Sequence, residues 1–167
     1  MDEKAATLPL ISVVMPCFNA QDYLREAVDS VLSQTYGQVE LIVVDDGSTD
    51  QSQNILKGYG DRIRVISQAN QGPYPARNLG VNASRGELLA FLDADDWWSP
   101  DCLEKLHAAL AAHPQAAVAY CGWQNIGKDG GRSDPYVPPD YELEEKAGRF
   151  LRAASPWPIH AALVREH

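Results

Sequence analysis

The sequence predicts an α/β protein with a mostly parallel sheet and helices on both of its faces. Apolar, β-branched runs alternate with segments of helical periodicity through most of the chain, which is the pattern of βα units. With 167 residues, 45% hydrophobic and 22% charged, the composition is that of an ordinary globular domain. A chain of this length can bury a proper core without disulfides or structural metals.

The first two predicted strands each lead into a helix. The first run spans Leu10–Met15 and stops at Pro16, and apolar residues at helical spacing follow between Leu24 and Leu32. The second run, Val39–Val44, ends in an acidic turn over residues 45–50 that contains Gly, Ser and Thr. The glycine favours a turn, and Ser, Thr or Asp can cap the helix that follows.

Three more strands are predicted, at Ile63–Ile66, Leu88–Leu92 and Ala117–Tyr120. A loop with glycine and prolines follows the first of them and leads into a helix that continues to about Ala83. Ser99-Pro100-Asp101 predicts another helix start, with a capping hydroxyl, a proline in the first turn and an acid near the positive end of the dipole.

Helical and strand periodicity both disappear between Gly122 and about Glu145, which predicts a long loop or an irregular hairpin. A short helix near Glu145–Ala153 and an apolar strand at Ala161–Val164 are expected to follow. Only three residues come after that strand, so we expect its free edge to favour self-association or a partner chain. The predicted organisation is a tail over 1–9, an α/β region over 10–121, and an incomplete region over 122–167.

Charge and cysteine content exclude several classes of function. The formal charge of −9 argues against a non-specific nucleic-acid or anionic-membrane surface, although a divalent cation can still bring an anionic ligand to an acidic site. The three cysteines have no C-x-x-C spacing and no signal-like segment precedes them, so neither a disulfide framework nor a zinc ribbon is predicted. A reducing, cytoplasmic location is expected, and no apolar run approaches the roughly 20 residues of a membrane span.

Four candidate functional features lie where predicted strands meet the following helices. This is the edge at which open α/β sheets bind ligands. Asp93 and Asp95 follow the fourth strand directly. Carboxylates of this kind, together with diphosphate oxygens, hold Mg²⁺ or Mn²⁺ in nucleotide chemistry. The alternative is that Asp93, Asp95 and Asp96 are solvated turn and helix-capping residues.

The other three features have similar alternatives. Asp45 and Asp46 either cap a helix or accept a hydrogen bond from a base N–H. Phe18, in the segment that begins at Pro16, either stacks on a nucleobase or belongs to the core. Arg77 either reaches a base or phosphate or lies on a solvated helix face. The dinucleotide, P-loop, zincin and hydrolase-elbow motifs are missing from the sequence, so those classes are excluded.

The combination of these features resembles the family 2 glycosyltransferases, which have a GT-A, Rossmann-like nucleotide-sugar fold. The resemblance runs from about Ile11 to Tyr120. It implies an inverting transferase that uses a nucleotide-sugar donor, here a UDP-sugar, and Mn²⁺ or Mg²⁺. It also implies a glycan or lipid-linked acceptor in cell-envelope polysaccharide synthesis, and a cytoplasmic location, peripheral at the inner face of the membrane. The motifs, in order, are S-V-V-M-P-C-F-N, V-E-L-I-V-V-D-D-G-S-T-D, N-Q-G-P-Y-P-A-R-N-L-G and L-L-A-F-L-D-A-D-D-W-W-S-P-D.

The resemblance also implies roles for individual residues. Phe18, with Pro16 near it, corresponds to the aromatic against the base, and Asp46, with Asp45 beside it, to the acid that reads the base. Arg77 corresponds to the arginine that closes over the nucleotide. Asp95 matches the principal metal ligand and Asp93 the position nearer the ribose or donor sugar, a second candidate metal ligand. Glu40 matches a motif acid that we interpret as structural.

The sequence departs from the family on the acceptor side. The catalytic base of these enzymes usually comes from a later acidic segment, so we expect it beyond His167 and expect this chain to bind donor but transfer sugar poorly. Two alternatives remain, a nucleotide-sugar-binding module without activity and a haloacid dehalogenase-type phosphatase with a nucleophilic first Asp. Four acids of the aperiodic segment match no motif and are not nominated as the base: Asp140, Glu142, Glu144 and Glu145.

Overall fold

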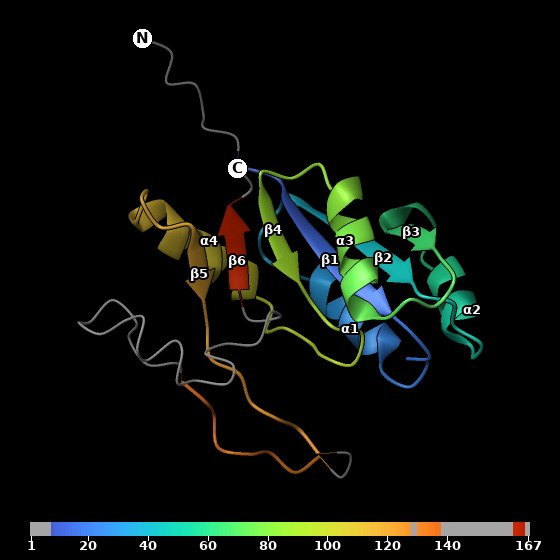
Figure 1. Cartoon of the computed structure of the whole chain (residues 1–167). Helices are drawn as coiled ribbons and strands as arrows, with labels where there is room; N and C mark the ends of the chain where they lie inside the picture. The colour runs from blue at the N-terminus through green and yellow to red at the C-terminus, as the bar shows by residue number, and fades with distance from the viewer. Residues whose placement is uncertain (1–7, 128–129, 138–161, 166–167) are drawn as a thin grey trace.

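One six-stranded sheet organises the computed structural model, which describes residues 8–127, 130–137 and 162–165 (Figure 1). The strand order is β3-β2-β1-β4-β6-β5, with β1, β2, β3 and β4 parallel and β6 antiparallel to both of its neighbours. The mostly parallel sheet predicted from the sequence is therefore confirmed. The strands are β1 Ile11–Cys17, β2 Val39–Asp45, β3 Arg64–Ser67, β4 Leu88–Phe91, β5 Val118–Tyr120 and β6 Ala162–Arg165.

Helices cover both faces of the sheet, as predicted (Figure 1). On one face, α1, α2 and α4 pack against alternate residues of the strands and form the larger hydrophobic core. On the other face, α3 packs over Ile42 and Val44 through Ala76 and Leu79. The helices are α1 Leu24–Leu32, α2 Ser52–Lys57, α3 Pro73–Ala83 and α4 Cys102–Ala112, with a 3₁₀ turn η1 at Gly60–Arg62. None of the helices in the described ranges is long and apolar enough to cross a membrane.

The first strand is the centre of the sheet and all seven of its residues are buried. It extends through Pro16 to Cys17, so the prediction that it stops at Pro16 is wrong. The Val14 carbonyl points toward β4 and accepts from the N–H of Leu92. The backbone nitrogen of Pro16, two residues further along the strand, points to the same side. Since β4 has already ended at Phe91, no strand needs the N–H that proline lacks.

The expected helix start at Ser99 is also corrected. The α4 helix begins at Cys102, and the Ser99 hydroxyl donates to the Asp101 carboxylate at 3.0 Å instead of capping the backbone. The cap position belongs to Asp101, whose side chain makes no capping bond. Proline at position 100 therefore precedes the helix.

The last strand does not lie at an edge of the sheet. It pairs with β4 through Leu89↔Val164 and with β5 through Ala119↔Leu163. The prediction that its free edge promotes self-association is wrong, because both of its sides are already paired and the edge belongs to β5. The helix expected at Glu145–Ala153 lies outside the described residues.

An irregular hairpin follows β5. Two isolated bridges, Trp123↔Tyr136 and Ile126↔Arg132, hold its two sides together. The Trp123 and Tyr136 rings lie with their centroids 4.1 Å apart. Its described residues are 122–127 and 130–137.

The α3 helix approaches the sheet closely at Gly80. A Cβ atom at this position would overlap the side chain of Val14 in β1. The absence of a side chain at Gly80 therefore sets how near α3 lies to the central strand.

We predict that Gly80→Ala destabilises the protein by about 1–3 kcal/mol, because overpacking outweighs the gain in helix propensity of about 1 kcal/mol. Urea unfolding measures the change. Adding Val14→Ala should recover about 1 kcal/mol relative to the sum of the two single losses. Gly37→Ala is the matched control, since open space surrounds Gly37. A Gly80→Ala variant as stable as the parent would contradict this account of the packing.

Glu40 joins three segments at the amino ends of the parallel strands. Its Oε1 accepts from the Ser12 hydroxyl at 2.6 Å and from the Arg85 N–H at 2.7 Å, and its Oε2 pairs with the Arg85 guanidinium at 3.2 Å. Burial raises the pKa of Glu40, but these hydrogen bonds outweigh burial and leave the pKa below its ordinary value. The structural role expected for Glu40 agrees with these contacts.

We predict that Glu40→Gln lowers the free energy of unfolding by roughly 1–3 kcal/mol at pH 7. Because the folded-state pKa is lowered, the stabilisation is present above the ordinary pKa near 4.5 and is lost as the pH falls through the folded-state pKa. Denaturant unfolding from pH 7 down to pH 3 should show the two proteins converging. Glu26→Gln, an exposed substitution on α1, serves as control. A difference that does not change with pH would show that the charge on Glu40 is not responsible.

Candidate functional site

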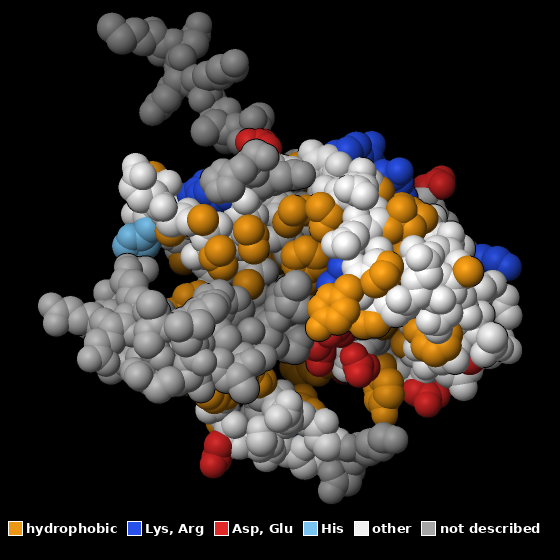
Figure 2. Space-filling view, viewed as in Figure 1, with side chains coloured by type: hydrophobic (Ala, Val, Ile, Leu, Met, Phe, Trp, Pro, Cys, Tyr) orange, Lys and Arg blue, Asp and Glu red, His pale blue; other side chains and the backbone are white. Residues whose placement is uncertain are grey.

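The predicted site residues lie along the carboxyl edge of β1, β2 and β4. The register Cys17↔Asp45 and Val14↔Phe91 places the ends of these strands next to each other. Phe18, the first residue after β1, is 48% exposed, so it is available for stacking and does not belong to the core. Pro16 is buried within β1. Figure 2 shows acidic and hydrophobic side chains close together on the face where α3 begins.

The loops after β1 and β2 are joined by side-chain hydrogen bonds. Asn19, which has a left-handed φ of 50°, accepts from the Thr49 N–H at 2.8 Å, while its own N–H donates to the Ser48 hydroxyl at 3.0 Å. The Ser52 hydroxyl accepts from the Ala20 N–H, and Asp50 accepts from the Gln21 N–H, both at 3.0 Å. The two loops therefore form one unit that fixes the position of Phe18.

Asp46 anchors the loop that leads into α3. Its Oδ1 accepts from Gln68 Nε2 at 2.6 Å and from the Gln71 N–H at 2.9 Å, and its Oδ2 accepts from the Gly72 N–H at 2.8 Å. Burial raises the pKa of Asp46, but these three hydrogen bonds outweigh it and lower the pKa, so the group is a carboxylate at neutral pH. An ionised carboxylate has about four acceptor positions, so Oδ2 can accept one more hydrogen bond.

Asp45 has a different position from its neighbour. The residue is fully buried at the end of β2, where Oδ1 accepts from the Ser48 N–H at 3.1 Å and Oδ2 from Gln53 Nε2 at 2.9 Å. It borders a cavity of about 280 Å³ beneath β3. These two hydrogen bonds hold the turn that presents Asp46.

Arg77 of α3 reaches across to the loop after β4 and forms an ion pair with Asp93. The side chain is 14% exposed, and among the described residues its buried Nε atom has no hydrogen-bond partner. The guanidinium also lies 5.9 Å from the ring of Tyr74, which is 76% exposed in the first turn of α3. A buried guanidinium N–H without a partner is costly, and an anionic oxygen would satisfy it.

The acids after β4 do not form a preassembled metal cage. Asp95 is exposed, and no hydrogen bond or ion pair joins its carboxylate to another described residue. Within the described ranges, no group of three or more His, Cys, Asp or Glu side chains could hold a metal. The donor set fits a hard cation that takes one or two carboxylate oxygens here and the rest from a diphosphate and water.

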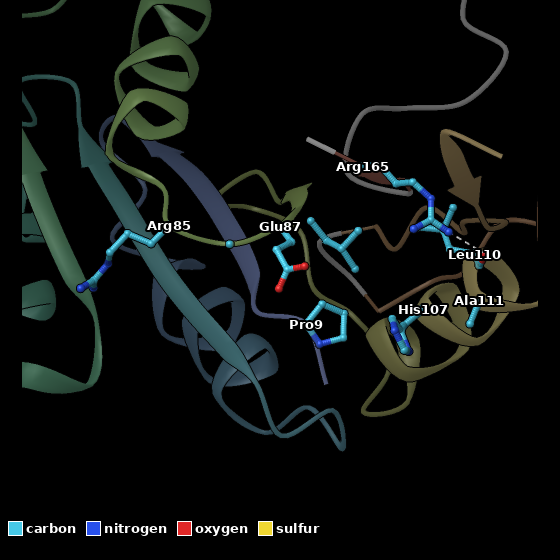
Figure 3. A pocket seen from close by; sticks show the side chains of 9 residues that line it. Pro9, Arg85, Glu87, His107, Leu110, Ala111 and Arg165 are labelled. Carbon is cyan, nitrogen blue, oxygen red and sulfur yellow. Dashed lines mark hydrogen bonds between the residues drawn. The ribbon is translucent and has the colours of Figure 1, made fainter. Parts of the chain in front are cut away.

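A second cavity lies at the opposite edge of the sheet and does not contain the predicted residues. It has a volume of about 510 Å³ and is lined by Pro9, Glu87 and His107, among others (Figure 3). Arg85, which also lines this cavity, is engaged by Glu40. The cavity lies where β1 and β4 begin, so it is separate from the carboxyl edge.

Sequence reasoning missed several residues that shape the candidate site. Gln68 and Gln71 hold Asp46, Asn19 joins the two loops, and Tyr74 lies beside Arg77. Gly72 gave the one local signal, because a glycine directly before a Pro-initiated helix suggests special backbone geometry, and its φ of 93° requires glycine.

The comparisons with known proteins agree with this geometry. Residues 12–166 match the model of the family "Glycosyl transferase family 2". The chain belongs to glycosyltransferase family 2. The uncharacterized glycosyltransferase EpsJ of Bacillus subtilis is 38% identical over 138 residues, which cover 81% of this chain and 39% of EpsJ.

Solved structures show the same fold. The structure of S. aureus TarS 1–349 in complex with UDP-GlcNAc has a TM-score of 0.72 at 24% identity and covers 93% of this chain and 45% of that one. The mannosyltransferase PcManGT of Pyrobaculum calidifontis, in complex with GDP-Man and Mn²⁺, has a TM-score of 0.62 at 24% identity, covering 70% of this chain and 36% of that one. The chain spans less than half the length of EpsJ and of each of these two structures.

Family membership corrects one alternative. The match of residues 12–166 to glycosyltransferase family 2 excludes the haloacid dehalogenase-type phosphatase. The four acids not nominated as catalytic base, at positions 140, 142, 144 and 145, lie outside the described residues.

Proposed function

We propose that this chain forms the donor-binding part of a glycosyltransferase that takes its sugar from a UDP-sugar, with inversion and with the help of Mn²⁺ or Mg²⁺. The observation that carries the proposal is that buried Arg77 pairs with Asp93 while its Nε has no acceptor among the described residues. Asp95, two residues after Asp93, has an exposed carboxylate. Such a combination suits a diphosphate and its cation. Binding of UDP-GlcNAc by TarS and of GDP-Man with Mn²⁺ by PcManGT supports this ligand class.

The nucleoside would occupy the β1–β2 end of the edge. Phe18 offers an exposed ring face for the base. The remaining acceptor position on Asp46 Oδ2 suits the N3–H of uracil, and the hydrogen bonds that hold Asp46 preorganise it for that contact. Cytosine carries no hydrogen on N3, so a carboxylate in this position discriminates against it.

The diphosphate would occupy the β4 end. A divalent cation bound to the diphosphate stabilises the charge that develops when the bond to the sugar breaks. Asp95, and Asp93 once its pairing with Arg77 is shared with a ligand, are the residues that would hold this cation. Arg77 would direct its free N–H to a phosphate oxygen.

We predict that UDP binds at least about tenfold more tightly with Mn²⁺ than with EDTA, because the acids after β4 repel a bare diphosphate and attract one that carries a cation. Asp95→Ala should remove most of this enhancement and leave binding in EDTA unchanged or slightly stronger. Isothermal titration measures all four affinities. Asp61→Ala, which removes an exposed acid from η1 at the opposite edge, is the control and should retain the full enhancement. Full metal enhancement in Asp95→Ala would exclude Asp95 as a ligand.

For base recognition, we predict that the parent binds UDP more tightly than CDP and that Asp46→Asn reverses or removes this preference. The donors Gln68 and Gln71 would hold the asparagine carbonyl at the Oδ1 position, which places the NH2 group where Oδ2 lies. In that orientation the amide donates to N3 of cytosine and no longer accepts from the N3–H of uracil. UDP affinity should fall roughly tenfold or more, with the metal enhancement unchanged. Equal losses for UDP and CDP would show that Asp46 only anchors the loop.

Transfer and donor hydrolysis distinguish an active enzyme from a module that binds nucleotide-sugar without turnover. The assay uses UDP-GlcNAc with Mn²⁺ and follows the release of UDP. UDP release that depends on Asp95 supports an active enzyme, whereas tight binding without release agrees with the expectation that this chain binds donor but transfers sugar poorly.

A further inference from the structure

The ion pair between Arg77 and Asp93 joins the residue expected to bind phosphate to a residue expected to bind the cation. Arg77 Nη2 in α3 donates to Asp93 Oδ1 in the loop after β4, and the two side chains are 14% and 31% exposed. One of the two acids that would hold a divalent cation is therefore already paired with a positive charge of the protein itself.

This pairing weakens the site for a cation that arrives alone. Asp93 and Asp95 belong to one tight turn, closed by a hydrogen bond of 3.0 Å from the Asp96 N–H to the Asp93 carbonyl. The guanidinium beside Asp93 offsets the charge of that carboxylate and repels a second cation. A divalent cation without a diphosphate then meets one unpaired carboxylate, that of Asp95, whereas Mg²⁺ sites usually combine one or two carboxylates with substrate phosphates.

A diphosphate offers Arg77 a better set of partners. The buried Nε of Arg77 has no acceptor among the described residues, although Nη2 is already bonded to Asp93. Phosphate oxygens can accept two parallel N–H bonds from one guanidinium, and their negative charge compensates for a weakened bond to Asp93. Binding of the diphosphate would thus satisfy Nε and release the Asp93 carboxylate for the cation.

The exchange of partners requires only the Arg77 side chain to move, because the helix that carries it is held at two points. The Gly72 N–H, directly before α3, donates to Asp46 Oδ2 at 2.8 Å. Further along, Gly80 lies so close to Val14 of β1 that a Cβ atom would overlap it. The α3 backbone therefore stays in place while the guanidinium changes its acceptor.

We propose that Arg77 withholds Asp93 from a divalent cation until a diphosphate binds the guanidinium, an inference that rests on the function proposed above. Arg77 acts on the cation through Asp93 and is in this respect a positioning residue. Cation and diphosphate then strengthen each other's binding by more than their direct contact provides. By linkage, the factor is the same for both ligands.

The test measures the affinity of the nucleotide-free chain for Mn²⁺ alone, by isothermal titration at about 0.15 M salt to screen exposed charges. Arg77→Gln should bind Mn²⁺ about tenfold more tightly than the parent, because Asp93 becomes available. The enhancement of UDP binding by Mn²⁺ should fall by about the same factor. Arg85→Gln is the matched control, since it breaks an arginine–carboxylate pair with Glu40 at the other end of the sheet and should leave the Mn²⁺ affinity unchanged.

A double-mutant cycle separates the ion pair from the general effect of a positive charge. In an Asp93→Asn background no carboxylate remains to be released, so Arg77→Gln should change the affinity for Mn²⁺ alone by less than about threefold. An equal gain in both backgrounds would overturn the inference, because Arg77 would then act on the cation only as a nearby charge. An unchanged Mn²⁺ affinity in Arg77→Gln would overturn it as well.

The same titrations distinguish failure of this inference from failure of the proposed function. A parent chain whose UDP affinity does not depend on Mn²⁺ would contradict the proposed function. A metal enhancement that is present in the parent and undiminished in Arg77→Gln would overturn only the role of the ion pair. If Arg77→Gln does not fold, Arg77→Lys takes its place, because the shorter side chain keeps the charge but reaches Asp93 less well and should also raise the affinity for Mn²⁺ alone.

Discussion

The carboxylate of Asp46 connects parts of the chain that would otherwise be independent. Asp46 directly follows β2, and its carboxylate accepts hydrogen bonds from Gln68, Gln71 and Gly72, in the segment that leads from β3 into α3. The position of α3 in turn decides where Arg77 meets Asp93 after β4. One buried charge thus relates three strand ends. Two backbone N–H groups and the Gln68 side-chain amide compensate for its burial.

The joined loops after β1 and β2 add rigidity at the same edge. Polar loops at strand ends are often mobile, but here Asn19, Asp50 and Ser52 give the backbone N–H groups of both loops fixed acceptors. Part of the entropic cost of ordering Phe18 is therefore met during folding. A ligand that stacks on this ring gains from a surface that is already in place.

The local sequence pattern was enough to predict the strands. Apolar, β-branched runs between turn residues, such as Val39–Val44 and Leu88–Leu92, are compatible with few structures other than a buried strand. The pattern also located the edge that carries Phe18, Asp46 and Asp95. It could not show that Arg77 pairs with Asp93 or that Gln68 holds Asp46, because these contacts join segments whose separation no periodicity encodes. The error over residues 162–165 has the same origin, since sequence identifies a strand but not its neighbours.

The insertion of β6 between β4 and β5 has a consequence for the order of assembly. The pair Tyr120↔Ala162 closes a loop of 41 residues, and β5 has no other strand partner among the described residues. On the ribosome, β1 to β4 emerge first and can associate through βα crossovers while β5 is still unpaired. The part built from β1 to β4 can thus nucleate early, whereas β5 and β6 wait for a non-local closure. Slow, topology-limited folding should be confined to these two strands.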